Sequence, residues 1–76
     1  MKSNQDNNAI AYFLAFCVEI YKNAHSLTGD EASTVLSESG ALDYLEDNYD
    51  VIHTQSHHWI LADIEEYLST YNVIQQ

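Results

Sequence analysis

The chain has 76 residues and is strongly acidic, with twelve Asp and Glu against two Lys, so that its formal net charge is −10. A chain of this length forms one domain that buries roughly 60% of the surface exposed by the unfolded form, and a hydrophobic content of 46% excludes a disordered polypeptide. The charge repels nucleic-acid backbones and anionic membranes over about 8 Å, so we expect neither as a partner, whereas a basic protein partner is favoured.

A long amphipathic helix is predicted from about residue 6 to residue 25, because apolar residues recur there at spacings of three and four. They are Ile10, Phe13, Leu14, Cys17, Ile20, Tyr21 and Ala24. Cys17 is the single cysteine and has no flanking base or cation, so it is expected to be a small buried hydrophobe rather than a catalytic thiol. A lone cysteine, with no signal peptide or membrane span, favours a cytoplasmic protein.

The second and third predicted helices are short. Thr28 and Glu31 have the spacing of a capping box, so a helix is expected to begin there and to stop at Gly40. A further helix of about eight residues follows from Ala41. Its exposed side forms an acidic patch, Asp43, Glu46, Asp47 and Asp50. The consecutive β-branched residues Val51 and Ile52 then predict a buried, extended linker.

The last helix is predicted to follow a cap at Thr54 or Ser56 and to end near Asn72. The fold class is therefore all-α: a compact bundle of about four helices, with long first and last helices, two short middle ones and a short extended segment around residues 50–55. We expect a single helical domain over residues 1–76, with frayed ends at 1–5 and 73–76.

Three histidines lie close together in the sequence, at positions 53, 57 and 58. With a nearby Asp they are weak candidates for a transition-metal site, because His53 and His57 are four residues apart. The favoured interpretation is that His53 donates a ring proton to a backbone carbonyl at the turn, while His57 and His58 are exposed in the first helical turn. We therefore expect no metal and no cofactor.

Aromatic residues are the candidates for contact with a partner, since tryptophan and tyrosine dominate binding hot spots. Either Trp59 covers the small core or it anchors an interface, and six tyrosines exceed what short helices easily bury. The candidate partner-binding residues are Trp59, Tyr44, Tyr71, Tyr12, Asp43, Glu46 and Asp47. The acidic residues are better explained as a solvated helix face than as paired catalytic carboxylates, so an enzyme is not expected.

The chain also resembles a family of small bacterial domains of unknown function from gut and other anaerobic bacteria. The most specific matching piece is Tyr49 to Gln55, with the pattern Tyr-Asp-Val-x-His-Thr-Gln. The other matching pieces are residues 16–22, 27–31, 40–45 and 60–68. The resemblance implies a stand-alone helical domain, and some such members are encoded beside proteins similar to ADP-ribosyltransferases, as in toxin and antitoxin pairs. It assigns no catalytic residue.

These observations favour a non-enzymatic protein–protein interaction module, in one form an antitoxin-like neutraliser of a neighbouring toxin. The supporting features are the excess of tyrosine and the net charge of −10. A histidine-based metal-binding or sensing domain is the first alternative. A structural homodimer that buries the Trp59 region and the C-terminal tail is the second.

Overall fold

The computed structural model describes the backbone of residues 2–75 and the side chains of residues 8–70. Residues 2–75 form five helices: α1 (Lys2–His25), α2 (Gly29–Glu38), α3 (Ala41–Asp47), α4 (Tyr49–Ile52) and α5 (His57–Gln75). The predicted all-α class is confirmed. The helix ends differ from the prediction, since α1 begins at Lys2 rather than near residue 6 and α5 continues past Asn72 to Gln75.

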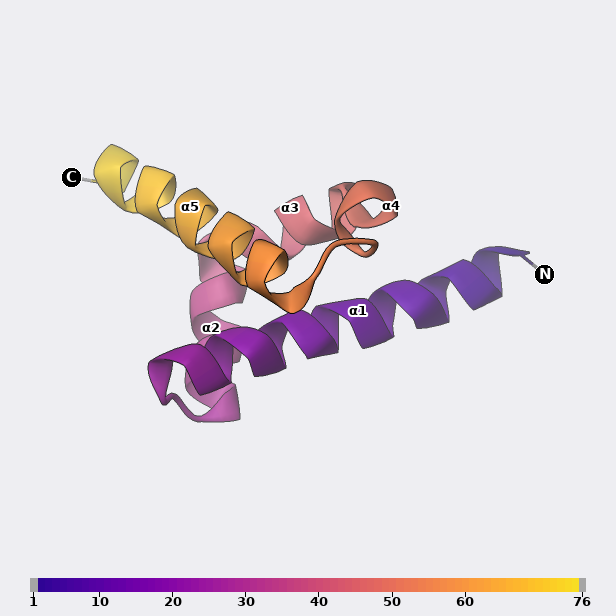
Figure 1. The fold of residues 1–76 in the computed structure, drawn as a ribbon, viewed down its shortest axis with the longest axis horizontal. Coiled ribbons are helices and arrows are strands. Elements are labelled where there is room, and N and C mark those ends of the chain that lie inside the picture. The colour runs from indigo at the N-terminus through magenta and orange to yellow at the C-terminus, as the bar shows by residue number, and fades with distance from the viewer. Residues whose placement is uncertain (1, 76) are drawn as a thin grey trace.

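The two long helices meet where the first turn of α5 crosses the middle of α1 (Figure 1). There the ring of His57 packs edge-on against Phe16, with centroids 4.8 Å apart. All five helices contribute side chains to one buried core, which therefore connects residues distant in sequence. Its members are Phe13, Cys17, Leu36, Ala41, Leu45, Ile52, Ile60, Ile64 and Leu68.

Two predicted helix starts are confirmed at atomic detail. At α2, the Thr28 hydroxyl accepts from the amide of Glu31 at 3.1 Å, and the Glu31 carboxylate accepts from the amide of Thr28 at 2.9 Å, which completes the capping box. At α5, the hydroxyl of Ser56 accepts from the amide of Trp59 at 3.2 Å. Ser56 is therefore the cap, whereas the Thr54 hydroxyl donates to the carbonyl of Val51.

The predicted extended, buried segment around residues 50–55 is wrong. Val51 and Ile52 lie in α4, where the carbonyl of Asn48 accepts from the amides of both. Ile52 is buried in the core, but Val51 is 62% exposed. One helical turn satisfies these amides and still buries Ile52, so tertiary packing overrides the weak strand preference of two β-branched residues.

Gly40 makes the sharp turn between α2 and α3, because it takes the left-handed conformation with φ of 88°. A Cβ added there would lie 2.9 Å from the hydroxyl of Tyr67. Replacing Gly40 with alanine is therefore expected to lower the free energy of unfolding by about 1–3 kcal/mol, measured by urea denaturation. The matched control is Gly29→Ala, whose added Cβ meets nothing within 4 Å. Equal losses in the two variants would contradict this explanation.

Candidate partner-binding surface

Tyr44 joins α3 to α5 rather than projecting freely into solvent. It is half-buried, its ring stacks on Tyr67 with centroids 4.8 Å apart, and its hydroxyl donates to Asp63 at 2.9 Å. Burial and then the hydrogen bond to Asp63 raise the pKa of Tyr44 to about 12, so the hydroxyl remains a donor at ordinary pH. The Tyr67 hydroxyl donates in turn to the carbonyl of Ser39 at 3.4 Å. These contacts fix the two stacked rings as a rigid platform.

Trp59 lies on the same side of α5 as Tyr67. It lies four residues before Asp63 and eight before Tyr67, a spacing that places all three on one side of a helix. Trp59 is 43% exposed, and its amide donates to the hydroxyl of the cap Ser56, three residues earlier. The backbone of Trp59 is therefore held at a defined position, while much of the residue is open to a partner.

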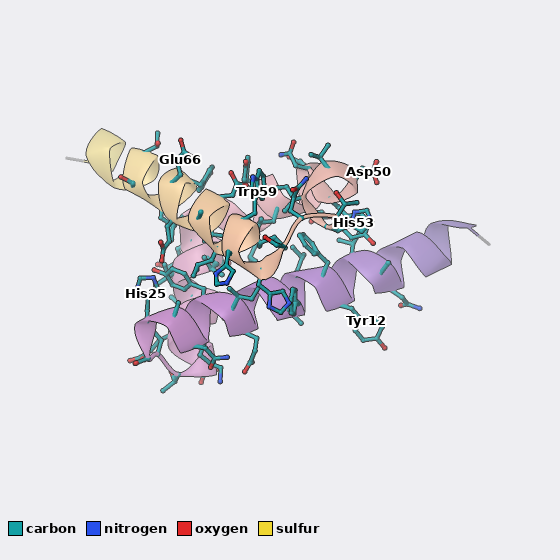
Figure 2. All side chains as sticks on the ribbon, in the orientation of Figure 1. Tyr12, His25, Asp50, His53, Trp59 and Glu66 are labelled. Carbon is teal, nitrogen blue, oxygen red and sulfur yellow. The ribbon has the colours of Figure 1, made fainter. Side chains whose placement is uncertain are left out.

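Carboxylates lie close to these aromatic residues along α3 and α5. Asp47 is exposed and lies three residues after Tyr44 on α3, while Glu66 is exposed and lies three residues after Asp63 on α5. In Figure 2 Glu66 and Trp59 are both on the side of α5 that faces away from α1. We call this set the α3–α5 surface: Tyr44, Asp47, Trp59, Asp63, Glu66 and Tyr67.

The remaining predicted contact residues lie in different places, and only some of them are beside the α3–α5 surface. Asp43 is exposed one turn before Asp47 and borders the α3–α5 surface. Glu46 is also exposed, but it follows Tyr44 by two residues and lies on the other side of α3. Tyr12 is 78% exposed on α1, away from this surface. The predicted contact at Tyr71 lies outside the described side chains, as does the tail at residues 73–76.

The predicted set omitted Asp63, Glu66 and Tyr67. The only sequence signal for them is their spacing of four, seven and eight residues from Trp59, which any helix with an inner face also shows. Their grouping with Tyr44 depends on how α3 packs against α5. That packing is not readable from a single helical pattern.

The histidines do not converge on one site. His53 donates from Nδ1 to the carbonyl of Tyr49 at 2.6 Å, as predicted. Its ring also stacks on the ring of Tyr49. His57 packs on Phe16, and His58 is exposed. His25 instead bridges α1 and α5 through a 2.8 Å contact with Glu65. Among the described residues, no three His, Cys, Asp or Glu side chains form a group that could hold a metal ion.

Cys17 is fully buried, as predicted. Burial raises the pKa of its thiol to about 12, because an apolar surrounding disfavours the thiolate. The thiol is therefore neutral and inaccessible in the folded protein, which excludes it as a reactive nucleophile. Separately, no helix among the described residues is long and apolar enough to cross a lipid bilayer.

Charge is unevenly divided between α1 and the rest of the chain. Both lysines, Lys2 and Lys22, lie on α1, where they balance Asp6 and Glu19. Lys22 and Glu19 also form an ion pair at 3.1 Å. Because two of the twelve acidic residues are on α1, the other ten are in residues 26–76, which contain no Lys or Arg. The α3–α5 surface therefore belongs to a part of the chain with a formal charge of −10, whereas α1 is neutral.

Comparison with known proteins gives one match. A family model with the description "Protein of unknown function (DUF3791)" matches residues 12–70. No curated protein and no solved structure matches the chain. The matched residues run from Tyr12 on α1 to Thr70 on α5 and include the whole α3–α5 surface. The expected membership of a family of unknown function is confirmed, and the chain belongs to the DUF3791 family.

Proposed function

We propose that this protein is a non-enzymatic interaction module that binds a basic protein partner through the α3–α5 surface. The observation that carries the proposal is the exposure of Trp59, 43%, on the side of α5 that also carries Asp63 and Tyr67, both of which contact Tyr44 of α3. A fixed aromatic anchor inside a polar rim is the common anatomy of protein interfaces.

The sign of the partner's charge follows from the charge distribution. Residues 26–76 carry a formal charge of −10 and no cation of their own, so they attract Lys and Arg side chains. An Arg side chain suits this surface best, because its guanidinium stacks on the indole face and donates to carboxylates such as Asp47 or Glu66. Such a partner associates faster and binds more strongly at low ionic strength.

The resemblance described above gives the proposal a specific form. In that form, the basic partner is a toxin encoded by the adjacent gene, and the domain neutralises it by covering its functional surface. The neutraliser needs no chemistry of its own, which agrees with a buried, protonated Cys17 and with a Tyr44 hydroxyl already committed to Asp63. The buried single thiol also suits a reducing cytoplasm, which we propose as its compartment.

Copurification at two salt concentrations tests this proposal. The tagged chain is coexpressed with the product of the adjacent gene, and in a parallel culture it is purified from its native host. A partner with a basic sequence is expected to be retained at about 0.01 M salt and lost at about 1 M, where the Debye length falls from roughly 30 Å to roughly 3 Å. A tagged protein that emerges alone from the coexpression at low salt would refute the toxin form. A partner that is acidic, or that survives high salt undiminished, would refute the basic partner.

A further inference from the structure

The outer side of α1 is an uncovered helix face with large and small side chains. Tyr12 is 78% exposed, and its neighbours Ala11 and Ala15 are also exposed, while Phe16 is 37% exposed and is partly covered by the ring of His57. Figure 1 shows the N-terminal half of α1 extending past the other helices, and Figure 2 shows Tyr12 pointing away from them. Aromatic side chains exposed on an uncovered helix are typical of an interaction surface rather than of a solvated face.

This face also lies on a helix whose formal charges sum to zero. Residues 9–18 contain no Asp, Glu, Lys or Arg, and α1 as a whole is neutral. A basic partner gains little electrostatic attraction here, because the carboxylate on this side of α1, Glu19, is already paired with Lys22 at 3.1 Å. The α1 face and the α3–α5 surface therefore select different partners.

We propose that the α1 face binds a second copy of this chain, so that two α1 helices pack antiparallel across a two-fold axis near Tyr12 and Ala15. Two copies each carrying −10 repel one another through residues 26–76, and α1 is the element on which they can approach without opposing like charges. With the axis at this position, Glu19 of each copy meets the uncharged turn around Asn8 of the other.

The shape of the face supports self-association. A two-fold interface uses the same patch on both copies, so that patch must offer both a projection and a recess. Here Tyr12 and Phe16, four residues apart, form a row of large side chains. Ala11 and Ala15, also four residues apart, form an adjacent row of small side chains. The rows of one helix can fit the grooves of the other, as in the common packing of helices along their i and i+4 ridges.

This inference does not depend on the proposed function, and the two kinds of complex respond to salt in opposite ways. Salt screens the repulsion between two acidic copies, so raising it strengthens the dimer, whereas it weakens a complex with a basic partner. The two surfaces also lie on opposite sides of the molecule, since Tyr12 points out from α1 and Trp59 lies beyond α5 (Figure 2). Failure of one binding activity therefore leaves the other measurable.

Sedimentation of the purified chain over a range of concentrations, at low and at high salt, tests the dimer. We expect a monomer–dimer equilibrium that shifts toward the dimer at high salt. Ala15→Glu places two carboxylates in the contact and is expected to weaken dimerisation at least about tenfold. The control Ser33→Glu adds the same charge at an exposed position on α2 and is expected to dimerise as the parent does.

Tyr12→Ala provides a second test without added charge, and it should also weaken the dimer. Because Ala15 and Tyr12 are exposed, circular dichroism is expected to show both variants folded. A chain that stays monomeric at every concentration and salt overturns the inference. A dimer that Ala15→Glu and Ser33→Glu weaken equally, or that forms better at low salt, overturns it as well.

Discussion

Replacement of Leu45 by alanine is expected to lower the free energy of unfolding by about 2–5 kcal/mol. Leu45 is fully buried on α3 and packs in the core with residues from the other four helices. A domain of 76 residues has a total stability of about 4–11 kcal/mol, so this loss removes a large part of it. The expected result is a protein that is partly unfolded at 37 °C.

Urea denaturation followed by circular dichroism measures this effect. Val51→Ala is the matched control, because it removes an aliphatic side chain that is 62% exposed on α4 and is expected to change stability by less than about 0.5 kcal/mol. A similar midpoint for Leu45→Ala and Val51→Ala would show that α3 does not pack in the core as described. The unfolding slope should stay unchanged in the control.

Replacement of Trp59 by alanine is expected to weaken binding of the copurified partner by about 2 kcal/mol or more, or at least about thirtyfold in dissociation constant. The indole is the largest exposed group on the α3–α5 surface, and its removal deletes the aromatic anchor of that surface. The core residues Ile60 and Ile64 remain in place, so the variant is expected to fold.

Tyr12→Ala is the control for that measurement. Tyr12 is more exposed than Trp59, 78% against 43%, but it lies on the neutral α1 helix. It is therefore expected to change partner affinity by less than about threefold while it weakens self-association. Calorimetric titration of the partner with each variant makes the comparison. A larger loss from Tyr12→Ala than from Trp59→Ala would move the binding surface from α3 and α5 to α1.

Features fixed by a few neighbouring residues were predictable from the sequence. The capping box at Thr28 and Glu31 and the turn at Gly40 depend on local hydrogen bonds and on backbone conformation, so a short pattern predicts them. The burial of Cys17 follows from the apolar period of α1. Tyr12, a predicted contact residue, is exposed on the outer side of the same helix.

Features that depend on packing between distant helices were not predictable in this way. The two β-branched residues at 51 and 52 favour an extended segment locally, but burial of Ile52 is achieved by a helical turn. Likewise, Tyr44 is partly exposed as expected, but its hydrogen bond to Asp63, 19 residues away, was not predicted. The spacing of residues within one helix does not show which faces of two different helices pack together.

Chemical-shift mapping of the complex tests the central claim most directly. Backbone amide spectra of the labelled chain are recorded with and without the copurified basic partner. The largest changes are expected on α3 from Asp43 to Asp47 and at the start of α5 from Trp59 to Glu66, together with the Trp59 indole N–H. Residues 9–16 of α1 are expected to stay unchanged. Changes confined to α1, with α3 and α5 unaffected, would contradict the proposed binding surface.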